Sequence, residues 1–113
     1  MRDEPFNKPG EFSRRVVALA LSVPRGRVTT YGHLARAAGA GPMAAQSITS
    51  ILGKAYDAGQ KDIPWHRIVY ADGRIWVTDE YRKKRMQLYK REKINIDKNG
   101  RVEDFRDKLF EFK

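Results

Sequence analysis

The sequence TTYGHLARAAGAGPMAAQSITSILG, residues 29–53, decides the fold of this 113-residue chain. Apolar residues recur three and four positions apart over residues 31–38 and 42–52, and this spacing predicts two helices. Two threonine hydroxyls just before the first helix suit its N-cap, and Pro42 suits the first turn of the second. Gly39-Ala40-Gly41 between them predicts a turn. Two short helices joined in this way are typical of a helix-turn-helix, although plain packing of two helices gives the same pattern.

The flanking sequence adds a third helix and short extended segments. Residues 11–23 carry an apolar stripe of helical spacing that ends at Pro24-Arg25-Gly26. Further along, Asp72-Gly73 predicts a hairpin turn between two apolar runs, 63–69 and 74–77, and so a small two-stranded element. The remaining expected elements are a helix over 79–92, a hairpin over 94–102 and a closing amphipathic segment over 105–112. We therefore predict a mainly α fold with a small β element.

Composition narrows the class of protein. A chain of 113 residues with 41% hydrophobic residues fits one folded domain, and we expect a monomer. The absence of cysteine excludes disulfides, thiolate metal sites and cysteine nucleophiles, and no other cluster with metal-ligand spacing occurs, so we expect no metal and no cofactor. No apolar run approaches the roughly 20 residues of a membrane span. Because the polar start does not resemble a signal peptide, we expect an intracellular protein, in the cytoplasm and nucleoid, or in the nucleus of a eukaryote.

The charge balance favours a polyanionic partner. Lysine and arginine number 23 against 14 acidic residues, giving a net charge of +9 and a pI near 10.0. This excess of positive charge predicts nucleic acid as the first candidate partner. Binding to an anionic membrane surface and a simple contribution to solubility are the weaker explanations of the charge. Seven of these cations lie in residues 82–93, beside the single acid Glu92. Because apolar residues interrupt the run, we interpret it as a solvated helix face and not as a free basic tail.

Three motifs carry a family resemblance: residues 24–32 (PRGRVTTYG), 41–46 (GPMAAQ) and 63–69 (IPWHRIV). Together and in this order, over about residues 11–78, they resemble the DNA-binding domain of the O6-alkylguanine-DNA alkyltransferases. The resemblance implies the winged helix-turn-helix-like fold of the alkyltransferase C-terminal domain. The expected organisation is an N-terminal extension over 1–10, the DNA-binding domain over 11–93, and a C-terminal extension over 94–113 packed on or beside it.

The position of the family's nucleophile is occupied by Trp65. In the alkyltransferases, the second residue of a Pro-Cys-His-Arg motif is the cysteine that accepts the alkyl group; here the motif reads Pro-Trp-His-Arg. An indole ring donates a hydrogen bond but offers no accessible lone pair for alkyl transfer. The chain thus resembles the alkyltransferase-like subgroup, which keeps the lesion-binding scaffold without the nucleophile. We expect a binding protein, since nothing supports an enzyme acting through His66 or His33.

The resemblance implies a lesion pocket formed by Tyr31, Trp65 and Ile68. A reader of alkylated guanine must rotate the base out of the stack and bury its alkyl group. By resemblance, Trp65 lies at the pocket floor, the backbone of Ile68 contacts the base edge, and the Tyr31 phenol lies near the phosphate of the target nucleotide. Judged without the family, Trp65 and Tyr31 are both ordinary core aromatics.

The expected DNA-binding residues are Tyr31 and four residues of the second helix, Gln46, Ser47, Thr49 and Ser50. The family carries an arginine at the position of Gln46, and this arginine fills the space that the flipped base leaves. Glutamine is shorter and uncharged, but its amide both donates and accepts hydrogen bonds. The small polar residues after it permit a close approach to the minor groove, where the family's helix binds.

Three further residues have structural interpretations. Without a thiol to activate, His66 is expected to be a hydrogen-bonded structural histidine. Arg67 is expected to be an internal hydrogen-bond or ion-pair donor that holds residues 63–69, which we call the motif loop, in place. Trp76 lies where the family has a serine- and glycine-rich or arginine-bearing loop over the pocket. It is either a second aromatic wall of the pocket or a core residue. Because aromatic residues in strands usually pack in the core, we favour the second interpretation.

Two functions from different classes follow. The first is a non-enzymatic sensor of DNA damage that binds double-stranded DNA containing O6-alkylguanine, flips the nucleotide, and flags it for nucleotide excision repair proteins. The alternative is a helix-turn-helix transcription regulator without lesion specificity, which reads the major groove. Gln46, at the exposed start of the expected recognition helix, is the best support for that alternative.

Overall fold

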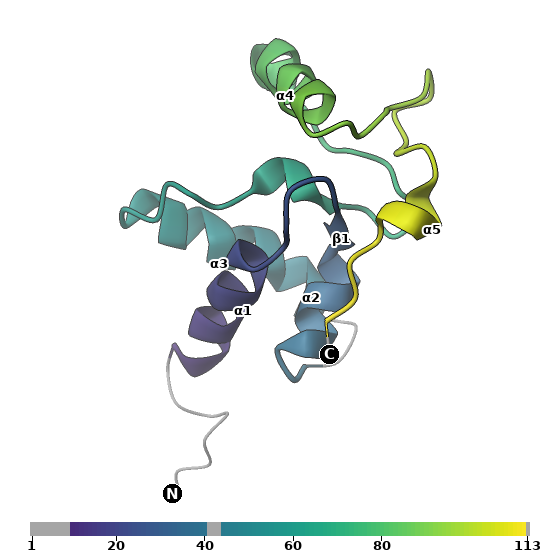
Figure 1. Ribbon diagram of the computed structural model, residues 1–113. Coiled ribbons are helices and arrows are strands. Elements are labelled where there is room, and N and C mark those ends of the chain that lie inside the picture. The colour runs from purple at the N-terminus through teal and green to yellow at the C-terminus, as the bar shows by residue number, and fades with distance from the viewer. Residues whose placement is uncertain (1–9, 41–43, 113) are drawn as a thin grey trace, which may run out of the picture.

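The computed structural model describes residues 10–40 and 44–112. In chain order the elements are α1 (Glu11–Leu21), β1 (Thr29–Thr30), α2 (Tyr31–Ala37), α3 (Ala45–Asp57), the 3-10 helix η3 (Trp65–Arg67), β2 (Ile68–Val69), α4 (Asp79–Arg91) and α5 (Phe105–Lys108). Figure 1 shows α1, α2 and α3 gathered together, with α4 set apart from them. None of the described helices is long and apolar enough to cross a membrane.

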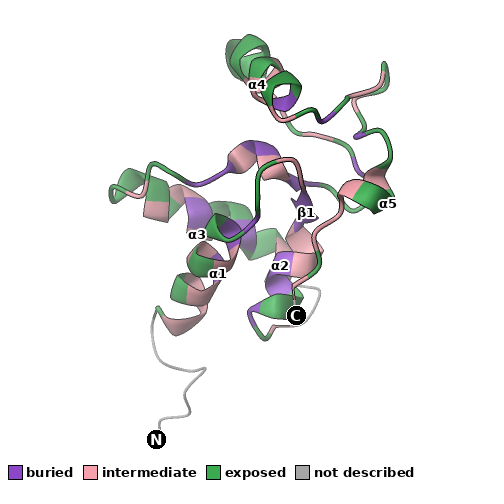
Figure 2. Ribbon diagram, viewed as in Figure 1, coloured by how far each residue is buried: buried purple, intermediate pink, exposed green. Residues whose placement is uncertain are grey.

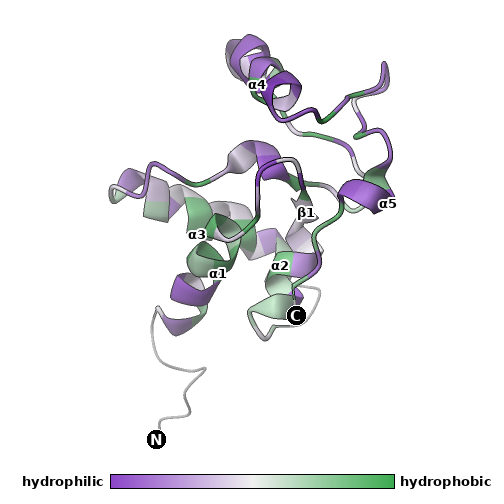
Figure 3. Ribbon diagram, in the orientation of Figure 1, coloured by the Kyte–Doolittle hydropathy of each residue, from purple (hydrophilic) through white to green (hydrophobic). Residues whose placement is uncertain are grey.

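The first hydrophobic core forms where α1, α2 and α3 meet. Each helix buries one stripe, and the side chains at its centre are completely shielded: Val16 and Ala20, Leu34 and Ala35, Ile48 and Leu52. Figures 2 and 3 show buried and hydrophobic segments of the three helices facing the same interior. The Thr30 hydroxyl caps α2 by accepting a hydrogen bond from the His33 N–H at 3.0 Å. The predicted helices over 11–23 and 31–38 are confirmed.

Helix α3 is longer than the sequence pattern predicts. We expected a helix over 42–52 ended by Gly53, but α3 continues through Gly53 to Asp57. A helix-interior glycine costs only about 1 kcal/mol relative to alanine, and packing of the next turn, including Ala55, against the core offsets this. The chain turns instead at Gly59, with φ of 120°. Pro42, the expected start, lies outside the described residues.

The two-stranded sheet is parallel and joins segments far apart in the sequence. Thr29 pairs with Ile68, and Thr30 with Val69. The predicted pairing of 63–69 with 74–77 is therefore wrong, although the turn at Asp72-Gly73 forms. Residues 65–67 are taken up by the 3-10 turn, and residue 74 makes an isolated bridge to residue 101. Parallel strands need a long crossover, which α2 and α3 provide here.

A second core ties the C-terminal residues to the body. Val28, Val69, Tyr89, Ile94 and Val102 are buried together. The expected hairpin over 94–102 contains an antiparallel bridge between residues 96 and 102. The expected closing amphipathic segment is helical only over α5 and then runs extended.

The extended segment after α5 pairs with Val28, the residue just before β1. The Val28 N–H donates to the Lys108 carbonyl at 2.9 Å, and the Phe110 N–H donates to the Val28 carbonyl at 2.7 Å. Arg27 adds side-chain hydrogen bonds to the carbonyls of Lys108 and Leu109. Residues 94–112 thus supply both core side chains and backbone partners.

Gly73 joins the turn after β2 to this C-terminal region, and its substitution tests that junction. Its φ is 88°, and a Cβ there would lie 3.2 Å from Cγ of Phe105. Gly100 has a similar φ of 80° with open space around it. Gly100→Ala should therefore lower the free energy of unfolding by about 1 to 2 kcal/mol, the cost of the left-handed backbone. Gly73→Ala should cost about 1 kcal/mol more because of overpacking.

Urea unfolding of both variants measures this difference. Equal losses of stability in the two variants would show that the Phe105 ring moves aside freely, and that the junction is not tightly packed.

Candidate nucleic-acid interface

The motif loop points Trp65 and His66 to different surroundings because it forms a 3-10 turn. The Trp65 N–H donates to the Ile63 carbonyl and the Arg67 N–H to the Pro64 carbonyl, both at 2.9 Å. In this tight geometry His66 is buried, whereas Trp65 is half-buried with its ring 6.5 Å, edge-on, from that of Tyr56. The indole therefore sits at the surface of the first core and not inside it.

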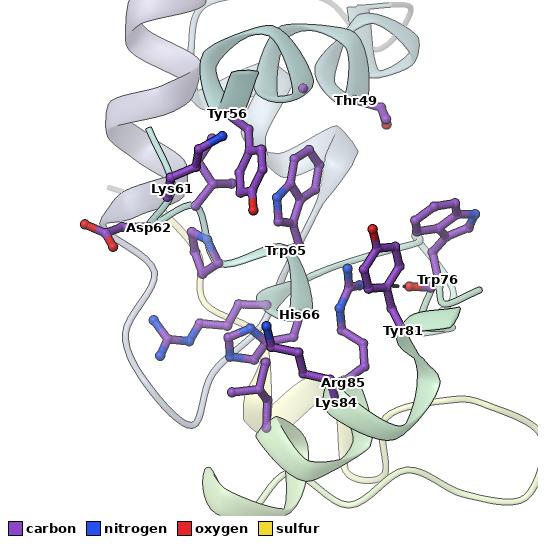
Figure 4. A pocket seen from close by; sticks show the side chains of 15 residues that line it. Thr49, Tyr56, Lys61, Asp62, Trp65, His66, Trp76, Tyr81, Lys84 and Arg85 are labelled. Carbon is purple, nitrogen blue, oxygen red and sulfur yellow. Dashed lines mark hydrogen bonds between the residues drawn. The ribbon is translucent and has the colours of Figure 1, made fainter. Parts of the chain in front are cut away.

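A pocket of about 540 Å³ lies between α3, the motif loop and α4. This volume lies within the usual range of binding sites for small ligands. Trp65 and Tyr56 form one aromatic wall, and Trp76 and Tyr81 stand opposite them, as Figure 4 shows. Thr49 and Gly53 of α3 contribute to the lining as well. The pocket can thus hold a planar ring between aromatic side chains.

Trp76 is a pocket wall, so the prediction that it is a core residue is wrong. Its side chain is 48% exposed. The segment 74–77 is not a sheet strand, and its partly buried side carries Ile75, which packs against the second core, so Trp76 points to the exposed side. The Arg85 guanidinium donates to the Trp76 carbonyl at 3.0 Å and so connects this segment to α4.

The predicted DNA-binding residues of α3 share its exposed face. Gln46, Ser47, Thr49 and Ser50 are all exposed, while Ile48 between them is completely buried. Of the four, Thr49 also lines the pocket; the other three do not. The pocket therefore opens beside the exposed face of α3, and one side chain belongs to both.

Tyr31 lies next to the pocket without lining it. It begins α2, is half-buried, and its ring centroid is 5.8 Å from that of Tyr70. Burial raises the pKa of Tyr31, against a smaller opposing effect of a hydrogen bond with Thr49. The phenol is therefore protonated at neutral pH. Its hydrogen bond with Thr49 connects it to a residue that lies both on the exposed face of α3 and in the pocket lining.

Ile68 is not brought to the pocket. Its side chain is 2% exposed in the first core, and its N–H donates to the Trp65 carbonyl. Of the three expected pocket residues, the structure places Trp65 in the lining, Tyr31 at its edge and Ile68 behind it.

The Glu92 carboxylate, at the C-terminal end of α4, holds the motif loop in place. It is 4% exposed and accepts hydrogen bonds from Arg67 Nη2 and His66 Nε2, each at 2.7 Å, and from the Gly26 N–H at 3.0 Å. Arg67 also donates to the Val23 carbonyl at 3.0 Å. The structural interpretations of His66 and Arg67 are confirmed. The sequence analysis did not predict this role of Glu92. The only hint in the sequence is that Glu92 is the single acidic residue among the basic residues 82–93.

The protonation states of Glu92 and His66 follow from these contacts. Burial by itself would raise the pKa of Glu92, but the hydrogen bonds from Arg67, Gly26 and His66 outweigh it and lower the pKa to about 2. Burial lowers the pKa of His66, more than the Glu92 carboxylate raises it. At neutral pH a neutral His66 therefore donates to a charged Glu92, and the charge of Glu92 is balanced by Arg67.

The other histidine, His33, has its Nδ1 2.6 Å from the Thr30 hydroxyl and its Nε2 3.9 Å from the Glu111 carboxylate. Within residues 10–40 and 44–112, no group of histidine and acidic side chains is placed to hold a metal ion. The arrangement offers a surface and a pocket for binding.

Comparisons of the sequence with known proteins identify the family. The model of the family "6-O-methylguanine DNA methyltransferase, DNA binding domain" matches residues 11–94. A DNA base-flipping protein of Escherichia coli (strain K12) is 29% identical over 102 residues, which cover 90% of this chain and 77% of that protein. A DNA base-flipping protein of Vibrio parahaemolyticus is 26% identical over 92 residues, 81% of this chain and 89% of the other.

Solved structures share the fold. A crystal structure of S. pombe Atl1 in complex with damaged DNA containing O6-carboxymethylguanine superposes with a TM-score of 0.72 at 21% identity, over 99% of this chain and 100% of that chain. A structure of S. pombe ATL in complex with DNA gives a TM-score of 0.69 at 23% identity, with the same coverage. The predicted alkyltransferase-like fold is thereby confirmed.

Replacing Glu92 tests the buried network. Glu92→Gln should lower the free energy of unfolding at neutral pH by about 3 kcal/mol, because it leaves Arg67 partly buried without a counter-charge. In the wild type, the stability that Glu92 contributes is present above its unfolded pKa of 4.5 and is lost as pH falls toward its folded pKa of about 2. The variant should lack this part of the acid-induced loss.

Urea unfolding at neutral pH and at about pH 3 measures both effects. Glu103→Gln, which removes an exposed carboxylate, is the matched control and should change neither. If Glu92→Gln were as stable as the wild type at neutral pH, the network would not hold the loop.

Proposed function

Because the chain belongs to the family of the 6-O-methylguanine DNA methyltransferase DNA-binding domain, we propose that it binds double-stranded DNA and turns O6-alkylated guanine into the pocket beside Trp65. The observation that carries this proposal is the position of the pocket beside the exposed face of α3. A base that leaves the stack at α3 has a ring-sized cavity next to it. The names of the base-flipping relatives and the complex of Atl1 with damaged DNA support the same function.

Helix α3 is the element that we propose to meet the duplex. Its exposed side chains Gln46, Ser47 and Ser50 are small or uncharged, which permits close backbone approach. The net charge of +9 supplies the attraction to phosphates that DNA binding requires. Gln46 would fill the space left by the flipped base, and the protonated Tyr31 phenol would donate to the backbone of the target strand.

The protein is proposed to bind the lesion without repairing it. The chain contains no cysteine, and Trp65 stands between Pro64 and His66 where the family's nucleophile would be. His66 is engaged with Glu92 and has no thiol to activate. The alkyl group then stays on the base, so removal of the lesion needs another pathway. By the family resemblance this is nucleotide excision repair; that link, a monomeric state and an intracellular location remain predictions from the sequence.

A competition between two duplexes tests the function. Fluorescence anisotropy at one fixed salt concentration should show tighter binding to a duplex with one O6-methylguanine than to the same duplex with guanine. Trp65→Ala and Trp76→Ala should each reduce this preference, because each removes an aromatic wall of the pocket. Trp76 is 48% exposed, so its variant should keep the wild-type fold.

Lys98→Gln is the control, since this exposed lysine lies outside the pocket beside Trp65. Equal binding of the two duplexes by the wild type would refute lesion recognition. It would favour a helix-turn-helix regulator instead, for which the exposed position of Gln46 on α3 is the supporting observation.

The role of Gln46 has its own test. Gln46→Arg should tighten binding to the lesion duplex, by about threefold to tenfold, because a longer cationic side chain fills the stack better and adds a charge-assisted hydrogen bond. The measurement is the same titration at moderate salt. Ser22→Arg, on an exposed residue after α1, adds the same charge away from α3. An equal gain in both variants would mean that the added charge acts at long range and that Gln46 does not enter the duplex.

A further inference from the structure

Besides Arg67, three cations line the pocket beside Trp65. Lys84 and Arg85 extend from α4, and Lys61 comes from the loop after α3. Figure 4 shows Lys84 and Arg85 reaching from α4 toward the pocket, with the Arg85 guanidinium beside Tyr81. The pocket is therefore aromatic on its walls and positively charged at its α4 side.

These cations have no anionic partner within the described part of the chain. The ion pairs there involve other basic residues, among them Arg67, which also lines the pocket and is neutralised by Glu92. Lys61 Nζ lies 4.0 Å from the Tyr56 ring centroid. Arg85 uses one N–H on the Trp76 carbonyl and keeps its other donors available.

One carboxylate, that of Asp62, belongs to the pocket lining as well. Figure 4 shows its side chain pointing away from Trp65 and from the two α4 cations. The cations are thus not compensated from inside the pocket. A group with negative charge is the ligand that such donors bind best, through short charge-assisted hydrogen bonds.

From this arrangement we infer that the pocket selects O6-alkyl groups by charge and favours those that end in an anion, such as a carboxylate. The inference rests on the proposed function and specifies its ligand class. The aromatic walls act on any flipped guanine, but Lys84 and Arg85 gain the stronger hydrogen bonds between opposite charges only from an anionic substituent. A neutral carbonyl of the same size accepts weaker hydrogen bonds, and a saturated alkyl group accepts none.

The same cations could bind DNA phosphates, and the two roles have different consequences. Phosphate contacts strengthen binding to every duplex of the same length by the same factor. Contacts with the lesion change only the ratio of affinities between duplexes that differ in the alkyl group. The ratio therefore isolates the role in lesion selection.

The test compares three duplexes at one salt concentration, with guanine, O6-carboxymethylguanine or its neutral isostere O6-carbamoylmethylguanine at the central position. We expect the carboxymethyl duplex to bind about tenfold more tightly than the carbamoylmethyl duplex, which corresponds to one hydrogen bond to a charged group. Both should bind more tightly than guanine.

Two variants assign the effect to residues. Lys84→Gln and Arg85→Gln should each lower the carboxymethyl-to-carbamoylmethyl ratio toward one. Lys83→Gln is the matched control, because Lys83 is the exposed neighbour on α4 outside the pocket lining. It should lower the three affinities equally, if at all, and leave the ratio unchanged.

The outcomes separate this inference from the proposed function. Equal affinities for the carboxymethyl and carbamoylmethyl duplexes, both above guanine, would overturn charge selection and leave lesion recognition intact. Equal affinities for all three duplexes would overturn the proposed function and charge selection with it. If Lys84→Gln and Arg85→Gln weakened every duplex by one factor, the cations would belong to phosphate binding and charge selection would again be overturned.

Discussion

The buried carboxylate of Glu92 is the constraint on which the geometry of the site depends. It joins three parts of the chain that are far apart in sequence: the turn at Gly26, the motif loop at His66 and Arg67, and the end of α4. A charged group at 4% exposure is tolerable only because a cation and two neutral donors surround it. Its hydrogen bonds therefore position α4 relative to Trp65, and they thereby set the shape of the pocket.

The two hydrophobic cores have different tasks in this arrangement. The first core holds α1, α2 and α3 together and presents a polar face of α3 outward. The second core, with Tyr89 and Ile94 at the end of α4, attaches that helix and the C-terminal segment to the strand residues Val28 and Val69. The pocket lies between α3, which packs in the first core, and α4, which is attached through the second core. Neither a helix-turn-helix nor a basic helix alone would form it. The proposed site for a flipped base therefore depends on both cores.

Local patterns in the sequence were sufficient for most of the helical segments. Period-3.6 stripes predicted α1, α2 and most of α3, because a helix buries one face through contacts between near neighbours in sequence. The structural roles of His66 and Arg67 followed from the absence of a thiol and from the chemistry of a guanidinium. The four residues expected to bind DNA on α3, Gln46, Ser47, Thr49 and Ser50, followed from the family resemblance, and their exposure fits the helical stripe through the buried Ile48.

The sequence by itself thus determined which segments are helical, which face of α3 is exposed, and that no cysteine is present to accept an alkyl group. Only the tertiary structure decided the partner of β2, the exposure of Trp76, the pocket wall made by α4, and the donors around Glu92. The physical reason is the range of the interactions. Helical stripes reflect contacts three or four residues apart, whereas the strand pair and the Glu92 network join residues separated by 25 to 66 positions. No local pattern records which distant segment will supply the partner.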